Sequence, residues 1–371
     1  MHNFIHLNST ALTQNLDALE KIVHPSTLVP VLKSNAYGHG LKEIYSCLKN
    51  KHKKWLCVND IAEAAQLRKL GFENRILVCG PVIHSDVKPA TKLDLDVFVG
   101  SHETLAAIVR CKNSALRVHL EFDTGMSRLG FAPENFEELL PSIENLNIVG
   151  ACMHFANVED VTNQTYALDQ LSRFELIRKP LKRKFPKILF HCAASAPALI
   201  LAKSRFDLCR VGIASYGLWP SSLTKLSFFQ TTKHKLELQP VLSWKTCVTQ
   251  LNFVRAGQFI GYGCTYKAPQ AMTIGVLPVG YFEGFPRAAG TASAHVLIQG
   301  QRCAVIGRIC MNMMMIDVSA LKNLAVGDEV TLIGQDKTEN ISVEDIANWC
   351  DSINYEVVSR LSPVIYRMIK K

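Results

Sequence analysis

Residues 28–40 read Leu-Val-Pro-Val-Leu-Lys-Ser-Asn-Ala-Tyr-Gly-His-Gly, an apolar run that ends on one lysine before a polar, glycine-rich turn. The run has the length and the valine and leucine content of a strand buried on both faces. At the end of such a strand Lys33 is costly unless it is paired, deprotonated or covalently used. Burial favours the neutral amine, which is the form that makes a Schiff base. The other interpretation is a lysine whose ammonium group reaches back to solvent.

Length and composition indicate a globular enzyme. The chain has 371 residues, enough for a barrel and a second domain. It is 48% hydrophobic and 20% charged, which is far from a disordered composition. The first residues, Met-His-Asn-Phe-Ile-His, lack the pattern of a signal peptide, and no apolar run reaches transmembrane length. We therefore expect no membrane partner.

The cysteines and the net charge narrow the partners further. Twelve scattered cysteines without a C-x-x-C pair are typical of a reducing compartment, so we expect a cytoplasmic protein and no metal site. The net charge is +9, and two basic clusters lie at residues 51–54 and 179–184 without interleaved aromatics. Solvated faces explain such clusters better than nucleic-acid binding does. The excess charge can instead draw small anionic substrates toward a cleft.

Strands and helices alternate from residue 26 to residue 212. Strands are expected at residues 26–33, 55–58, 75–80, 96–100, 115–123, 147–155, 187–192 and 207–212. Amphipathic helices are expected between them at residues 61–70, 102–111 and 166–179. Eight such units in one run indicate an α/β fold with a closed (β/α)8 barrel. The alternative is an open doubly wound sheet, although no G-x-G-x-x-G follows the first strand.

Past residue 235 the pattern changes to short strands between glycine-containing turns. The expected strands are residues 241–249, 272–279, 294–298 and 328–333, with one helix at residues 343–350. These segments predict a mostly antiparallel β domain. The predicted domains are therefore a barrel at residues 1–232 and a β domain at residues 233–371.

Polar residues gather at the expected carboxyl ends of the barrel strands, where barrel enzymes carry their chemistry. Beyond Lys33 these residues are Tyr37, Arg128, His154, Ser195 and Arg210. Taken singly, a histidine such as His154 is more often a structural core residue, and an arginine such as Arg210 serves as an ion-pair partner. Their convergence on one face favours an active site. In the β domain, Tyr262 and Tyr281 adjoin glycines, which equally mark turns.

Together these segments closely resemble the alanine racemase family, whose members are pyridoxal-phosphate enzymes with a barrel and a C-terminal β domain. The resemblance covers nearly the whole chain. Its most specific motifs are V-x-K-x-N-A-Y-G-H-G around Lys33, D-T-G-M-x-R-L-G around Arg128 and R-x-G-I-x-x-Y-G from Arg210. It implies pyridoxal 5'-phosphate as cofactor, L-alanine and D-alanine as substrates, and a homodimer with shared active sites. It also implies a supply of D-alanine for peptidoglycan.

The resemblance implies a pair of acid/base groups. Lys33 would form the internal aldimine and act on one face of the substrate, and Tyr262 of a second copy would act on the other, because inversion needs a base on each face. Tyrosine has an unperturbed pKa near ~10, and His154 and Arg210 are the candidates for lowering it. Arg210 would also face the pyridine nitrogen. A guanidinium has no proton to give at neutral pH, so that nitrogen stays unprotonated.

The other implied roles are in binding. The phosphate would be held by Tyr37, Ser195 and the backbone of Gly212 and Ile213. The substrate carboxylate would meet Arg128 and the backbone of Met311. Tyr281 would line the entry.

Four positions depart from the family pattern. Glu121 stands where the family often has a carbamylated lysine facing the arginine that matches Arg128, so we expect activity without added bicarbonate. Asn312 replaces an aspartate. No tyrosine is identified for the phosphate near the C-terminus, where Pro363 lies near the expected place. An asparagine is lost beside Ser195.

Three other functions were compared with this one. A cofactor-carrying homeostasis protein shares the barrel and its lysine but lacks a second domain. A decarboxylase of the same fold group places a carboxylate where Arg210 stands. A broader-specificity amino-acid racemase stays open as the alternative, although Met311 and Tyr281 suggest a narrow pocket.

Overall fold

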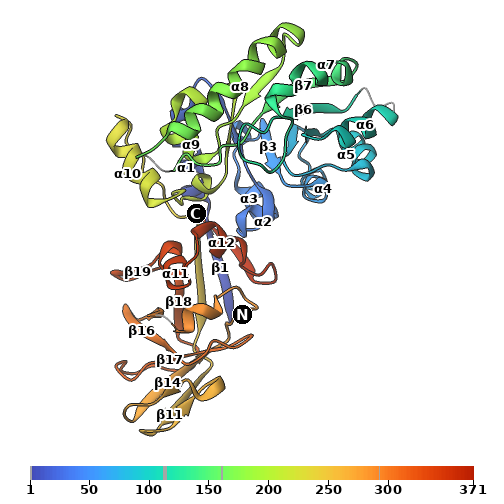
Figure 1. Ribbon diagram of the computed structural model, residues 1–371. Coiled ribbons are helices and arrows are strands. Elements are labelled where there is room, and N and C mark those ends of the chain that lie inside the picture. The colour runs from blue at the N-terminus through green and yellow to red at the C-terminus, as the bar shows by residue number, and fades with distance from the viewer. Residues whose placement is uncertain (1, 112–114, 160–161, 292) are drawn as a thin grey trace. The chain divides into compact units, whose positions relative to one another are not determined.

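The computed structural model describes residues 2–111, 115–159, 162–291 and 293–371. The chain forms two compact units, and Figure 1 draws the chain with its colour following the residue number. The α/β unit comprises residues 10–36 and 44–239, and the β unit comprises the chain up to residue 9, residues 37–43 and residues 240–371. The domains at residues 1–232 and 233–371 remain predictions.

Eight parallel strands form the barrel of the α/β unit. They are β2 Thr27–Pro30, β3 Trp55–Val58, β4 Arg75–Val78, β5 Asp96–Val99, β6 Arg117–Glu121, β7 Asn147–Cys152, β8 Leu189–His191 and β9 Leu208–Val211. Strands β3 to β8 pair in chain order, and β2 pairs with β9. The ring closes where Leu32 N–H donates to the Cys57 carbonyl at 2.7 Å and Arg210 N–H donates to the Ala193 carbonyl at 2.9 Å. The predicted (β/α)8 barrel is confirmed.

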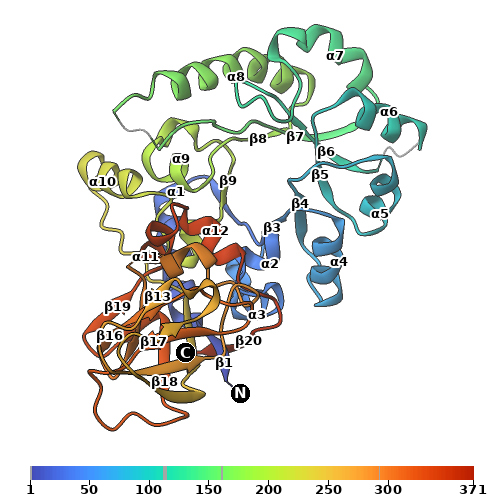
Figure 2. The same cartoon turned by 60° about the horizontal axis from the view of Figure 1, so that its bottom comes forward.

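Helices cover the outside of the barrel strands, as Figure 2 shows for β4 to β8. The helices that begin before residue 232 are α1 Ser9–Val23, α3 Leu41–Cys47, α4 Ile61–Lys69, α5 Val87–Lys92, α6 His102–Arg110, α7 Phe136–Ile143, α8 Thr165–Lys184, α9 Ser195–Ile200 and α10 Ser222–Thr231. The predicted helices α4, α6 and α8 are confirmed. Among the described residues, no helix has both the length and the hydrophobicity needed to cross a bilayer.

Helix α8 continues five residues beyond its predicted end at residue 179. Pro180 lies inside it and has no N–H for the carbonyl of Leu176, four residues earlier. Leu176 is 72% exposed, so water can satisfy that carbonyl. A proline therefore need not end a helix where the helix faces solvent.

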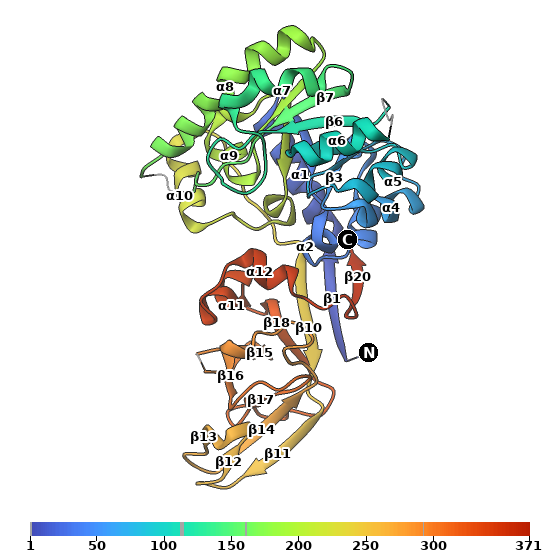
Figure 3. The same cartoon turned by 45° about the vertical axis from the view of Figure 1, so that its right-hand side comes forward.

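A long, mostly antiparallel sheet forms the β unit, and Figure 3 follows its strands. Its order is β11-β14-β17-β16-β15-β18-β10-β1-β20, with β19 beside β18. The bounds are β1 Asn3–Asn8, β10 Leu242–Cys247, β11 Gln250–Val254, β14 Met272–Leu277, β15 His295–Ile298, β16 Gln301–Ile306, β17 Met314–Asp317, β18 Glu329–Asp336, β19 Glu339–Ile341 and β20 Tyr366–Lys370. A separate pair joins β12 Phe259–Ile260 to β13 Tyr266–Lys267, and two helices follow, α11 Val343–Trp349 and α12 Asn354–Ser359. The predicted β architecture is confirmed.

The sheet also contains strands that the sequence analysis did not predict, namely β1, β11, β16, β17, β19 and β20. Strand β1 pairs antiparallel with β10 and parallel with β20, which is the last strand of the chain. Ile5 and Leu7 alternate with more exposed residues along β1 and are fully buried. The alternation is only six residues long, and its pairing partners lie more than 230 residues away, so local sequence gives little sign of it.

Candidate active site

Lys33 follows strand β2 and opens a left-handed turn, labelled α2 Lys33–Tyr37. The four residues from Ser34 to Tyr37 have φ between 52 and 57°, and Gly38 continues at 75°. Residues other than glycine pay roughly 1–2 kcal/mol each in this conformation. The expected glycine-rich turn is therefore a strained backbone segment, which is a common feature of functional sites.

Hydrogen bonds from both sides hold the turn. Ala36 N–H donates to the Leu32 carbonyl at 2.9 Å, and Asn35 N–H donates to Glu63 Oε1 at 3.0 Å. The other carboxylate oxygen of Glu63 accepts from Asn59 N–H at 2.8 Å. Glu63 thus ties the turn to the residue that follows β3, and the position of Lys33 is fixed by contacts beyond its own segment.

The loop after β6 is organised by one carboxylate. Asp123 Oδ1 accepts from the backbone N–H groups of Gly125, Met126 and Ser127 at 2.8, 2.7 and 3.1 Å. Burial raises the pKa of Asp123, but these backbone donors outweigh it and hold the pKa below its ordinary value. The loop then presents Arg128 as an exposed side chain.

Electrostatics shows that four predicted site residues share the carboxyl end of the barrel. Burial comes first, and three positive charges add to it, in lowering the pKa of His154 to about 3. Those charges belong to Arg210, Arg128 and Lys33. At this pKa the imidazole of His154 is neutral at pH 7. The convergence of these residues, expected from the strand order, is present in the α/β unit.

Glu121 lies in the same electrostatic environment. Burial raises its pKa to about 7, against the lowering effect of Arg210 and Arg128. The residue is 6% exposed at the end of β6. A carboxyl group near half-protonation at neutral pH is the kind of perturbed group that marks functional sites.

Arg210, on β9, is buried with its guanidinium held along one edge. Its Nη1 atom donates to the His191 carbonyl at 3.0 Å and to His191 Nδ1, and Nη2 donates to the Met153 carbonyl at 3.1 Å. Among the described residues, Nε–H has no hydrogen-bond acceptor. A buried guanidinium with one N–H group that has no acceptor can donate to an acceptor such as a pyridine nitrogen.

Ser195 and the segment after β9 form a cradle of backbone donors. Ser195 is 4% exposed, and its Oγ accepts from Gly212 N–H at 3.1 Å and Ala214 N–H at 3.5 Å. Ile213 lies between these donors and is fully buried. Backbone N–H groups beside a hydroxyl are the donors that proteins use to hold phosphate.

Tyr262 lies in the β unit, on a tight turn between Gly261 and Gly263. Both glycines have positive φ, 76 and 73°. Residues other than glycine rarely adopt this conformation, so the positive φ values explain why glycine occupies both positions. The turn leaves Tyr262 71% exposed.

The segments that carry Tyr281 and Met311 pack backbone to backbone in the β unit. Tyr281 N–H donates to the Cys310 carbonyl at 3.1 Å, and a Cβ at Gly280 would lie 2.4 Å from the Met311 carbonyl oxygen. The glycine is therefore required for this close approach. The two segments bring Tyr281 and Met311 together as exposed side chains.

Asn312 has a specific partner. Its Nδ2 donates to Glu283 Oε1 at 2.8 Å, while Glu283 Oε2 accepts from Gly280 N–H at 2.8 Å. An aspartate at position 312 would set two carboxylates against each other. The asparagine that replaces the family's aspartate at position 312 is therefore paired with the carboxylate of Glu283.

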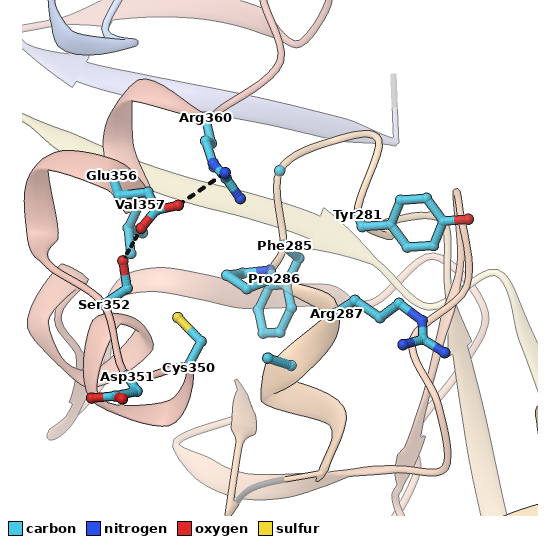
Figure 4. Close-up of a pocket in the computed structure, with 12 residues that line it drawn as sticks. Tyr281, Phe285, Pro286, Arg287, Cys350, Asp351, Ser352, Glu356, Val357 and Arg360 are labelled. Carbon is cyan, nitrogen blue, oxygen red and sulfur yellow. Dashed lines mark hydrogen bonds and ion pairs between the residues drawn. The ribbon is translucent and has the colours of Figure 1, made fainter.

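A pocket of about 520 Å³ lies in the β unit (Figure 4). Tyr281 and Arg287 lie on one side of it in this view, opposite Cys350. Glu356 accepts from Ser352 and pairs with Arg360 at 3.0 Å. The predicted entry residue thus lines a pocket with both polar and apolar side chains.

The sequence analysis identified no tyrosine near the C-terminus for the phosphate, and that statement stays a prediction. Tyr355, on α12, packs its ring 6.3 Å from the ring of Tyr37. The sequence analysis looked near Pro363 and passed over this residue, because α12 was not predicted. A short apolar periodicity after Asn354 was the only local sign of that helix.

The expectation of no metal site stays a prediction. Among the described residues, the oxygen and nitrogen donors of Asp17, Glu20 and His52 lie within 4.8 Å of one another. Lys51 Nζ lies 2.6 Å from Asp17 Oδ1, so an ammonium group already supplies positive charge there.

Comparison with known proteins gives one family over both units. The models described as alanine racemase N-terminal domain and C-terminal domain match residues 7–220 and 241–369. The alanine racemase of Leptospira interrogans is 36% identical over 372 residues, covering 99% of this chain and 95% of that protein. A structure of alanine racemase from Bacillus anthracis with bound L-Ala-P has a TM-score of 0.91 at 28% identity, covering 100% of this chain and 95% of that one. One from Bartonella henselae with covalently bound pyridoxal phosphate has a TM-score of 0.86 at 25% identity, with full coverage of both chains.

Proposed function

Because this chain belongs to the alanine racemase family, we propose that it interconverts L-alanine and D-alanine with pyridoxal 5'-phosphate as its cofactor. The family consists of pyridoxal-phosphate-dependent isomerases, and this chain is an enzyme of that class. The observation that carries the proposal is the shared electrostatic environment of Lys33, Arg128, His154 and Arg210 at one end of the barrel.

The residues present fit the cofactor. The Ser195 hydroxyl with the Gly212 and Ile213 backbone would hold its phosphate, and Tyr37 would add a hydroxyl. Tyr355 packs on Tyr37 and would orient it. The unpaired donor of the buried Arg210 suits the ring nitrogen, and Lys33 Nζ would bind the cofactor covalently.

When bound, pyridoxal phosphate withdraws electrons from the α-carbon of alanine and so makes its proton acidic. Lys33 Nζ would remove or return that proton on one face, and the Tyr262 hydroxyl would do so on the other. Arg128 and the Met311 backbone would hold the carboxylate of the substrate. Glu121 would balance the charge of Arg128, and Asn312 would help to fix the segment that carries Met311. Neutral His154 would stay within reach as a hydrogen-bond partner, and Tyr281 would restrict entry.

We also propose a homodimer with shared sites, which the exposure of Tyr262 supports. A tyrosine that works as a base needs positive charge or hydrogen-bond donors beside its hydroxyl to lower its pKa, because burial alone would raise it. Tyr262 is 71% exposed in the single chain, and Met311 is 55% exposed. A second copy packed against these residues would place the positive charge of its Arg210 near Tyr262.

The physiological role that we propose is the supply of D-alanine for cell-wall peptidoglycan, in the reducing compartment of the cytoplasm. All twelve cysteines are free thiols, which agrees with such a compartment. Five of them are buried in the core as small apolar side chains, and none is needed for the reaction as proposed.

The first experiment is an isotope exchange. The purified holoenzyme is incubated with L-alanine in deuterium oxide, and both enantiomers are analysed for α-deuterium. Borohydride reduction followed by peptide mass analysis locates the cofactor. We expect the label in both enantiomers and the cofactor on the peptide that contains Lys33.

The outcomes separate the candidate functions. Cofactor on Lys33 without α-exchange of alanine would favour a carrier protein. Faster exchange of lysine or arginine than of alanine would favour the broader-specificity racemase. A chain that takes up no cofactor would overturn the proposal, including the roles of the barrel residues.

A further inference from the structure

A column of buried polar side chains crosses the barrel and ends at Arg210. Asp96, His119 and His191 are fully buried, and Arg210 is 6% exposed. Asp96 Oδ1 lies 3.1 Å from His119 Nε2, and His119 Nδ1 lies 2.8 Å from His191 Nε2. His191 Nδ1 lies 2.5 Å from Arg210 Nη1. The column joins the amino end of β5 to β9, the last strand of the barrel. Asp96, His119 and His191 were not among the predicted site residues.

Each link of the column has only one possible donor. A guanidinium only donates, so His191 Nδ1 must be a bare acceptor. The hydrogen of neutral His191 is then on Nε2 and points at His119 Nδ1. By the same rule His119 carries its hydrogen on Nε2 and donates to Asp96. Every hydrogen bond therefore runs from Arg210 toward the carboxylate.

The charges along the column agree with that direction. Burial lowers the pKa of both His119 and His191, so both rings are neutral at pH 7. Burial alone would raise the pKa of Asp96, but the hydrogen bonds from Arg75 and His119 hold it well below its usual range. A proton that left Arg210 along the column would have to end on this carboxylate, which is a very weak base. Arg210 consequently stays charged.

The packing leaves no freedom for the histidines to turn. A Cβ at Gly150 would lie 1.9 Å from His119 Nδ1, so the ring occupies space that any other residue would fill. The Phe98 ring lies 5.5 Å from the His191 ring and 5.5 Å from Arg210 Cζ. Arg75 donates to Asp96 Oδ2 at 2.8 Å at the far end. The column is anchored at both ends and along its side.

We propose that Asp96, His119 and His191 are positioning residues that fix Arg210 as a permanently charged donor facing the pyridine nitrogen of the cofactor. This inference rests on the proposed function and adds a device that controls which reaction the barrel performs. With one edge of the guanidinium held by the column, its Nε–H has a fixed direction. If the guanidinium were free to rotate, water could protonate the ring nitrogen and electron withdrawal would strengthen. Alanine would then leave as pyruvate, with its amino group transferred to the cofactor, which would become pyridoxamine phosphate.

The first test uses the wild-type chain without cofactor. Nitrogen-15 spectra of histidine-labelled protein distinguish the two neutral tautomers and the charged ring. We expect His119 and His191 each to carry one hydrogen, on Nε2. A hydrogen on Nδ1 of either ring, or a doubly protonated ring, would overturn the direction of the column.

The second test compares two substitutions at one position. His119→Phe fills the space between the aromatic neighbours but removes the acceptor for His191. His119→Asn places an amide oxygen near the position of Nδ1 and keeps that acceptor. Val118→Ala, on the same strand, is the control for lost packing. The readouts are the His191 tautomer and the amount of pyruvate formed per alanine racemised.

Without an acceptor for its Nε2–H, the His191 ring can turn away from Arg210. We therefore expect His119→Phe to lose the fixed His191 tautomer and to raise the pyruvate ratio about tenfold, as the loss of one buried hydrogen bond allows. His119→Asn and Val118→Ala should stay near the wild-type ratio. A folded His119→Phe variant with an unchanged tautomer and ratio would show that the column is only structural. A wild-type chain that binds no cofactor would instead overturn the proposed function, while its histidine spectra would still decide the direction of the column.

Discussion

The barrel part and the β-unit part of the predicted site are built in opposite ways. In the barrel, Arg210 is 6% exposed and held by three hydrogen bonds, and Lys33 is followed by a strained turn that several contacts hold. In the β unit, Tyr262 is 71% exposed and Met311 is 55% exposed. The barrel residues are organised by burial within one chain, whereas the β-unit residues lie on a surface.

The difference suggests a division of labour. Burial in the barrel perturbs the pKa values of His154 and Glu121, which is the kind of tuning that acid–base chemistry needs. No comparable burial acts on Tyr262 in the single chain. We therefore expect a second copy of the chain to supply the groups that surround the Tyr262 hydroxyl.

Mixing two inactive variants tests that division, and it has the largest expected effect. Lys33→Ala and Tyr262→Phe should each lose at least ~100-fold in activity, because each removes one acid/base group. If sites are shared, a mixed dimer pairs the intact Lys33 of one copy with the intact Tyr262 of the other. Random mixing should then restore about a quarter of wild-type activity. The measurement is activity after the two proteins are denatured and refolded together.

The control is each variant refolded alone. If Lys33 and Tyr262 of the same chain work together, every site in the mixed dimer lacks one group, and mixing restores nothing. That result would contradict the inference that the β-unit residues need a second copy of the chain to complete the site.

Substitution of Glu121 measures how much the burial of an ionised carboxylate in the barrel lowers the free energy of unfolding. Its pKa is about 7 in the folded chain against an ordinary 4.5, so the folded state binds more protons between these values. The free energy of unfolding should therefore fall as pH rises from 4.5 to 7, by about 3 kcal/mol, and level off above. Glu121→Gln does not ionise and should be more stable than wild type by this amount at pH 8, with little difference at pH 4.5.

Denaturant titrations of both proteins across this pH range measure the effect. Glu137→Gln, on the exposed face of α7, is the matched control and should leave the pH dependence unchanged. A Glu121→Gln advantage that does not vary with pH would contradict the raised pKa.

Substitution of Asn312 is the corresponding stability measurement in the β unit, and we expect a smaller effect there. Asn312→Asp removes the hydrogen bond to Glu283 and adds a repulsion, and solvent exposure limits the cost to about 1 kcal/mol. Adding Glu283→Gln should recover most of the loss, since the new amide can donate to the aspartate. A double-mutant cycle in denaturant measures the coupling, and additive effects would show that the pair does not interact.

The sequence could predict the barrel because its strands are short apolar runs with local signals, such as residues 55–58 and 207–212. The clustering of Lys33, His154 and Arg210 followed from strand order alone. The column through Asp96 and His119 was out of reach, because a histidine within a strand has no local mark that shows its partners. The pairing of Tyr37 with Tyr355 depends on residues more than 300 positions apart.

The left-handed conformation of the turn after Lys33 was not predicted, for a different reason. Glycines at positions 38 and 40 indicated a turn, but nothing in Ser34 or Asn35 demands a left-handed conformation across four residues. That conformation is imposed by contacts such as the bond from Asn35 N–H to Glu63. Strain of this kind is set by tertiary structure and is therefore invisible to local propensity.

Ser34 provides the finest test of the barrel, with the smallest expected effect. Ser34 is exposed and has a φ of 57°, so Ser34→Gly relieves strain without removing buried contacts. After the greater entropy loss of glycine on folding is subtracted, we expect a gain of about 0.5 kcal/mol in the free energy of unfolding. Activity should fall, because the backbone that follows Lys33 is then less restricted. Ser34→Ala keeps the strain and is the control; equal stabilisation by both variants would mean that the turn stores no strain at this position.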